Sequence, residues 1–210
     1  MPTSLPKLIL VELIGTFFLA LLVGILLLNV GTTGYLTLYL PFGIAGAVGL
    51  LAYCFQETGS SFFNPAIALG MFLVKKLTIT KLVLSIVAEL VGAYVGILLA
   101  RYLSDAPLLA PQGFGLRAEL GEFLGTALFV FAATRVALGQ VPPAASGLVI
   151  GGSLFVSLSI AQVVSGGILN PALAVGLGSY HISYLVMPLL GSIFGALLSR
   201  FLQPAVPVYA

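Results

Sequence analysis

The sequence has very few of the residues that water-soluble proteins, disulfides and metal sites require. Only 7% of its 210 residues are charged, against about 25% in soluble domains, so the chain cannot cover a globule with a water-facing surface. A single cysteine excludes an internal disulfide, and with one histidine and no CxxC pair the sequence predicts no metal site. The net charge of +2 is too small to indicate a nucleic-acid partner.

Apolar residues, in contrast, make up 60% of the chain, and the mean hydropathy is +1.20. A bilayer core about 30 Å thick needs roughly 20 apolar residues per spanning helix. Six runs of about this length are present, at about 7–29, 37–57, 80–103, 117–138, 143–164 and 182–203. We therefore expect an all-α, multi-pass protein of the lipid bilayer with six transmembrane helices.

Two shorter apolar pieces, at about 64–74 and 170–178, are near half the spanning length. Each begins with Asn-Pro-Ala, in the stretches SSFFNPAIALG and SGGILNPALAVG. Asparagine is a good N-cap, and proline fits the first helical position because no hydrogen bond is lost there. The pattern predicts two half-helices that begin at the motifs Asn64, Pro65, Ala66 and Asn170, Pro171, Ala172.

The basic residues indicate the orientation of the chain in the membrane. Six spans place both termini on one side, and the piece at 64–74 must then enter and leave on the same side, as a re-entrant segment. The basic residues on the side of the termini are Lys7, Lys75, Lys76, Lys81, Arg135 and Arg200, against Arg101 and Arg117 on the other. The positive-inside rule then predicts cytoplasmic N- and C-termini, in a plasma or cell membrane.

The two halves of the sequence resemble each other. VELIGTFFLALL at 11–22 matches GEFLGTALFVFA at 121–132, and the two Asn-Pro-Ala motifs match. Two Gly-x-x-x-Gly pairs, each followed by arginine, also recur: Gly92 and Gly96, then Gly191 and Gly195. We expect one transmembrane domain over 1–210, with one repeat at about 8–103 and a second at about 118–203. Because each repeat holds three spans, the second must be inverted in the membrane.

Inversion brings the starts of the two half-helices toward each other near the bilayer midplane. Irregular backbone is tolerated there only where protein buries it or a wet cavity accepts it. Each helix N-terminus carries about half a positive charge, so the pair repels cations, while the amides of Asn64 and Asn170 can donate to a neutral oxygen. The sequence thus predicts a passive channel for water or small uncharged solutes. An ion-coupled secondary transporter and a non-conducting membrane protein remain as alternatives, and an enzyme is not expected.

Six helices, two Asn-Pro-Ala half-helices and Glu-x-x-Gly-Thr at the start of helices one and four resemble the aquaporins, the major intrinsic protein (MIP) family. The resemblance covers nearly the whole chain. It implies a homotetramer with one pore per protomer, passive conduction of water or small uncharged solutes, and no cofactor. It also implies that Glu12 and Glu122 accept hydrogen bonds from backbone amides of the re-entrant loops.

The chain departs from the family pattern after the second motif, where Leu173 stands in place of the usual arginine. The same comparison gives a selectivity filter of Phe42 or Ile44, Leu158, Gly167 and Leu173, with no side-chain donor. Such a constriction either conducts water slowly or passes larger, less polar solutes; Leu173 could also pack away from the pore. Glu89 replaces a common glutamine, and a neutral acid and a hydrogen-bonded carboxylate are both open for it.

Overall fold

The computed structural model describes residues 4–29, 36–59, 61–104, 113–204 and 208–209. These residues form α-helices joined by short turns. Six helical segments are long and apolar enough to cross a membrane, as the sequence predicts. The helices are α1 (Leu5–Asn29), α2 (Leu36–Phe55), α3 (Pro65–Leu73), α4 (Ile79–Ser104), α5 (Leu116–Ala137), α6 (Ser146–Ala161), α7 (Pro171–Leu177), α8 (Ile182–Leu185) and α9 (Met187–Phe201). Two single 3₁₀ turns, Gln56–Thr58 and Pro143–Ala145, follow α2 and precede α6.

The spanning helices pair in the same way in both halves. α1 packs along α4 in the first half, and α5 packs along α9 in the second, while α2 and α6 join the halves. A Cβ atom on Gly92 or Gly96 would lie 2.5 Å from a backbone oxygen of α1, and one on Gly191 or Gly195 would lie 2.4 or 2.2 Å from a backbone oxygen of α5. Only glycine permits helices to approach this closely, so both Gly-x-x-x-Gly pairs are packing sites.

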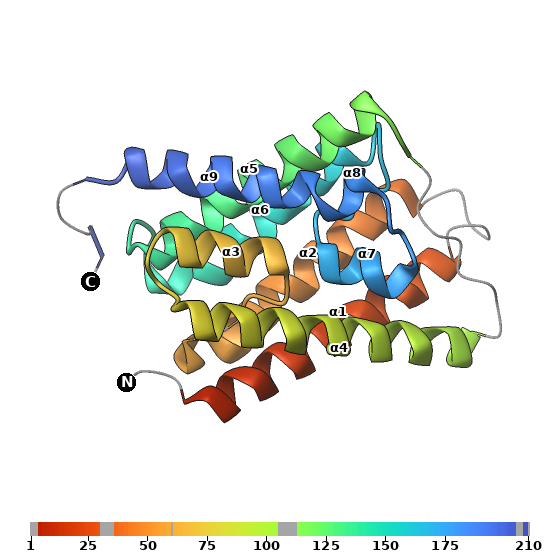
Figure 1. Ribbon diagram of the computed structural model, residues 1–210, viewed down its shortest axis with the longest axis horizontal. Coiled ribbons are helices and arrows are strands. Elements are labelled where there is room, and N and C mark those ends of the chain that lie inside the picture. The colour runs from red at the N-terminus through yellow and green to blue at the C-terminus, as the bar shows by residue number, and fades with distance from the viewer. Residues whose placement is uncertain (1–3, 30–35, 60, 105–112, 205–207, 210) are drawn as a thin grey trace.

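The two half-helices lie end to end in the middle of the bundle (Figure 1). α3 lies toward the end of the molecule that holds both chain termini, and α7 lies toward the opposite end. Both termini are thus on one side, which requires that α3 does not cross the membrane. This is the re-entrant arrangement that the basic residues predict.

The sixth span differs from the single continuous helix that the sequence predicts. It is divided into α8 and α9, with the break at Val186. Pro188 follows in the first turn of α9. Proline has no backbone N–H and its ring clashes with the carbonyl four residues earlier, so a regular helix cannot continue through this position.

Candidate functional site

Each half-helix begins at the asparagine of its Asn-Pro-Ala motif. Asn64 has an extended backbone, and its Oδ1 accepts a hydrogen bond from the N–H of Ala66 at 2.9 Å. Asn170 does the same with the N–H of Ala172 at 3.0 Å, and its Oδ1 lies 3.4 Å from the N of Leu173. In both cases proline follows in the first turn. These are the two N-caps that the sequence predicts.

The two asparagines also hold the two motifs together. Nδ2 of Asn64 donates to the carbonyl oxygen of Leu169 at 2.9 Å, and Nδ2 of Asn170 donates to the carbonyl oxygen of Phe63 at 2.9 Å. Each side-chain amide has two N–H groups. One links the halves, and the second is available to the cavity that both side chains line. Nothing in the sequence indicates these reciprocal bonds.

Glu12 and Glu122 are fully buried and bind the backbone just before each motif. Glu12 accepts hydrogen bonds from the N–H groups of Phe62 and Phe63, the latter at 2.7 Å. Glu122 accepts from the N–H groups of Ile168 and Leu169, at 3.0 and 2.7 Å. Each carboxyl group therefore satisfies backbone donors that have no helix or sheet partner at membrane depth.

These bonds also orient the carbonyl groups of the second loop. In a trans peptide the C=O of one residue points opposite to the N–H of the next. The N–H of Gly167 donates to Ser165 Oγ, and those of Ile168 and Leu169 donate to Glu122. The carbonyl oxygens of residues 166, 167 and 168 consequently point away from Glu122, toward the cavity that these residues line. They form a row of hydrogen-bond acceptors.

The glycine of each Glu-x-x-Gly-Thr motif makes room for the residue before the asparagine. Phe63 and Leu169 both have φ of 52°, an uncommon backbone for these residue types, and both side chains are buried. A Cβ on Gly15 would lie 2.0 Å from the Phe63 ring, and one on Gly125 would lie 2.9 Å from Leu169 Cδ2. In each Glu-x-x-Gly-Thr motif, the glutamate thus binds the backbone of the loop, and the glycine leaves room for a side chain of the same loop.

We expect Gly15→Ala to destabilise the protein by about 1–3 kcal/mol, because the new methyl group overlaps the Phe63 ring. Thermal unfolding in detergent measures this. Gly46→Ala in α2 is the matched control, since a Cβ there meets nothing within 4 Å. Equal stability of the two variants would show that the Phe63 ring can be accommodated without a glycine at position 15.

A cavity of about 40 Å³, called the outer cavity below, lies between the asparagines and the end of the bundle opposite the termini. Ile44, Leu158, Gly167 and Leu173 all line it. Its other described lining is also apolar apart from the two asparagines and the backbone, and includes Leu19, Val23, Val48, Phe129 and Leu154.

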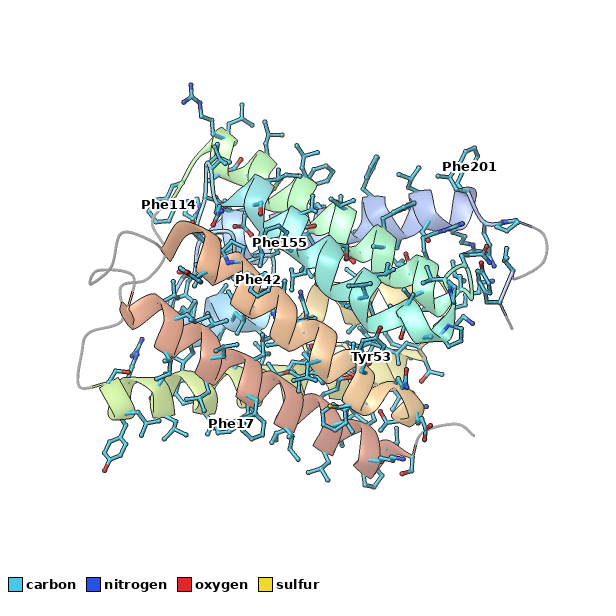
Figure 2. The ribbon with its side chains drawn as sticks, turned by 180° about the vertical axis from the view of Figure 1, so that it is seen from behind. Phe17, Phe42, Tyr53, Phe114, Phe155 and Phe201 are labelled. Atoms are coloured by element: carbon cyan, nitrogen blue, oxygen red, sulfur yellow. The ribbon has the colours of Figure 1, made fainter. Side chains whose placement is uncertain are left out.

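Of the two candidates on the second span, Ile44 lines this cavity and Phe42 does not. Phe42 is 70% exposed, and its ring packs edge-on against Phe155 of α6 on the outer surface (Figure 2). Ile44 is 8% exposed. Residues two positions apart in a helix differ in direction by about 200°, so only one of the pair can face inward. The lining of the cavity therefore favours Ile44 over Phe42 as the filter residue of this helix.

A larger cavity of about 380 Å³ lies on the side of the termini. Its lining includes Gln56, Ser61 and Lys76, and it is thus more polar than the outer cavity. Val48, Phe62 and Phe129 line both cavities and mark the boundary between them. Sequence reasoning missed Val48 and Phe129, because an apolar residue of a spanning helix carries no signal that distinguishes a pore wall from a packing face.

A model of the family described as Major intrinsic protein matches residues 3–115 and again residues 110–208, one match for each half of the fold. The chain belongs to the major intrinsic protein family. It is therefore an integral membrane protein of the aquaporin family, whose members are channels and not enzymes. The described residues contain no group of three His, Cys, Asp or Glu side chains that could hold a metal ion.

Relatives in the family come from plants, a fungus and an archaeon. The MIP chain is 32% identical to "Aquaporin PIP2-5" of Oryza sativa subsp. japonica over 161 residues, which cover 70% of this chain and 56% of the plant protein. It is 26% identical to "Aquaporin AqpM" of Methanothermobacter marburgensis over 203 residues, covering 86% and 81%. The alignments thus span about half the length of the rice aquaporins.

The fold is also found in a solved structure. The X-ray structure of the aquaglyceroporin from Plasmodium falciparum superposes with a TM-score of 0.70, covering 94% of this chain and 95% of the other. The sequence identity is 22%, so the likeness concerns the fold. Six spans with two half-helices, expected from the sequence, are the architecture of this MIP protein.

Proposed function

We propose that this MIP protein is a passive channel that conducts water and small uncharged solutes between its two half-helices. The observation that carries the proposal is the meeting of the Asn64 and Asn170 side chains at one cavity. Each amide is fixed by a bond to the opposite loop, and each keeps an N–H for a passing solute. A neutral solute that moves inward can donate hydrogen bonds to the carbonyl oxygens of residues 166, 167 and 168. It can then accept hydrogen bonds from the two asparagine amides near the midplane.

The same geometry supports the exclusion of cations. The N-terminal ends of α3 and α7, each with about half a positive charge, face this point from opposite sides. The described side chains that line the outer cavity carry no charge to offset these fields. An ion-coupled transporter would need titratable or ion-binding side chains that line this cavity. The cavity offers two asparagine amides instead, which favours the channel over the transporter.

We propose Ile44, Leu158, Gly167 and Leu173 as the selectivity filter. These residues supply three aliphatic side chains and a glycine, so the polar groups of the proposed filter are backbone carbonyls. The small volume of this cavity, about 40 Å³, favours small solutes over large ones. Among small solutes, the apolar wall favours those whose hydration shell is removed at a low cost in free energy.

The proposal includes the orientation and the assembly. Lys7 and Lys81 lie at the start of α1 and α4, and Arg135 and Arg200 lie in the last turn of α5 and α9, all at the end that holds the termini. By the positive-inside rule this end is cytoplasmic. Membership of the MIP family supports a homotetramer with one pore per protomer.

Stopped-flow light scattering of proteoliposomes tests the solute range. After equilibration with an impermeant osmolyte, a jump in urea, glycerol or methylurea reports solute entry as swelling. We expect entry to fall steeply with solute size, and water to exchange faster than any of them. Liposomes without protein provide the baseline. If water and every solute cross no faster than in liposomes without protein, the protein keeps the fold but does not conduct.

A further inference from the structure

Tyr184 contacts the second re-entrant loop from the short helix α8. Its side chain is fully buried, and α8 packs against α5, α7 and α9. The hydroxyl oxygen of Tyr184 accepts a hydrogen bond from the N–H of Gly166 at 3.0 Å. Gly166 lines the outer cavity, whereas Tyr184 does not. A side chain outside the cavity thus holds a residue of the cavity wall.

This bond completes the hydrogen bonds of the loop between α6 and α7. The neighbouring N–H groups have partners on α5, on α6 or in the loop itself: Ser165 donates to the Ala161 carbonyl, Gly167 to Ser165 Oγ, and Ile168 and Leu169 to Glu122. Gly166 differs, because its N–H reaches a side chain of α8. Residues 166 and 167 are both glycines, which have the widest choice of backbone conformations. Hydrogen bonds therefore have to fix the backbone at this point of the cavity wall.

The segment before α5 packs around the Tyr184 hydroxyl and its loop. A Cβ on Gly113 would lie 3.0 Å from this hydroxyl oxygen and 2.9 Å from the Cα of Ser165, so the glycine permits the close approach of the tyrosine to the loop. Phe114, labelled in Figure 2, packs its ring edge-on against Tyr184, with the ring centroids 6.5 Å apart. The same phenylalanine contacts the ring of His181, the N-cap of α8. These contacts hold the tyrosine ring in place.

The first half of the molecule differs at the matching position. The alignment of the repeats that pairs Gly92 with Gly191 also pairs Ser85 with Tyr184. Ser85 is fully buried within the continuous helix α4, and its hydroxyl has no hydrogen-bond partner among the described residues. In the second half, the break before α9 gives the sixth span a separate first segment, and Tyr184 lies in it. The tyrosine bond is therefore a feature of the loop that borders the outer cavity.

We propose that Tyr184 is a positioning residue for solute selection in the outer cavity. Its hydroxyl fixes the N–H of Gly166, and with it the plane of the peptide that joins Ser165 to Gly166. Without the hydroxyl this N–H loses its partner, and two consecutive glycines are free to change conformation. The width of the cavity at these glycines is then set from α8, by a group that no solute touches. The effect on solutes rests on the proposed function, whereas the anchoring of Gly166 does not.

Tyr184→Phe removes the hydroxyl and keeps the ring, so it tests the effect on solutes. In proteoliposomes we expect the ratio of urea permeability to water permeability to rise about threefold or more, as the loss of one hydrogen bond allows. Tyr53→Phe is the matched control, because the Tyr53 hydroxyl donates to the Ala144 carbonyl at 2.8 Å but lies outside the outer cavity. Its ratio should equal that of the wild type. A ratio in Tyr184→Phe that stays at the wild-type value or falls would overturn the proposed role in selection.

Hydrogen exchange at the Gly166 amide tests the anchor without any need for conduction. The sequence has two Ser-Gly pairs, at 146–147 and 165–166. Cell-free protein with ¹³C-carbonyl serine and ¹⁵N-glycine therefore gives two carbonyl-filtered amide signals in NMR spectra, and Ser146→Ala identifies the one from Gly166.

We expect this amide to exchange with deuterium about tenfold faster or more in Tyr184→Phe than in the wild type, with the Gly147 amide unchanged. Equal exchange of Gly166 in the two proteins would overturn the anchor. Faster exchange in a protein that conducts nothing would contradict the channel and leave the anchor in place.

Discussion

Asn64→Asp and Asn170→Asp each give the protein a cation conductance that the wild type lacks. Aspartate keeps the N-cap, because its carboxylate accepts from Ala66 or Ala172 as the amide oxygen does. It loses the donor to the opposite loop and adds a negative charge at the point where the two half-helix fields meet. A full negative charge exceeds the half positive charge of one helix N-terminus, so the electrostatic barrier to cations changes sign locally.

Potassium and proton fluxes into proteoliposomes, followed with ion-sensitive dyes, measure this effect. Asn64→Ser and Asn170→Ser are the matched controls, since serine keeps a capping oxygen and removes the cross-link without adding charge. We expect cation entry at least tenfold above the wild type in the aspartate variants and not in the serine variants. Equal leaks in serine and aspartate variants would assign cation exclusion to the packing of the loops and not to the field of the half-helices.

Leu173→Arg narrows the range of solutes that cross the membrane. Leu173 follows the second Asn-Pro-Ala motif and is the third residue of α7. It is 4% exposed and lines the outer cavity with Ile44 and Leu158. An arginine there adds volume, a positive charge and several donors to a section of about 40 Å³. We expect the ratio of urea permeability to water permeability to fall about tenfold, which corresponds to about 1.4 kcal/mol.

Leu173→Met is the control for this substitution, because methionine has a similar volume and no charge. Its ratio of solute to water permeability should remain close to that of the wild type. If the arginine variant has the same ratio as the methionine variant, the narrow section of the pathway does not include residue 173. Selectivity would then have to be set at the boundary formed by Val48, Phe62 and Phe129.

Local and periodic features of the sequence predict most of the fold. Spans follow from apolar length, the half-helix starts from the capping chemistry of Asn64 and Asn170, and the close helix pairs from the spacing of Gly92 and Gly96. Each of these depends on residues near one another in the chain. The break before α9 was missed, although Pro188 was visible, because a proline in the first turn of a helix and one inside a longer helix look alike in the sequence.

The contacts of the site were less predictable, because they join residues far apart in the chain. The bond from Asn64 to Leu169 spans 105 positions, and the one from Asn170 to Phe63 spans 107. The choice between Phe42 and Ile44 depends on the rotation of α2 in the bundle. Inverted symmetry indicated that the motifs meet, but not which atoms bond.

The central claim is that a continuous path for water passes between the two half-helices. Osmotic shrinkage of proteoliposomes in an impermeant osmolyte, recorded by stopped-flow light scattering, tests it most directly. We expect wild-type shrinkage several-fold faster than that of empty liposomes, with a weaker dependence on temperature, since water in a pore does not have to dissolve in the lipid. Shrinkage at the rate and with the temperature dependence of empty liposomes would contradict the claim.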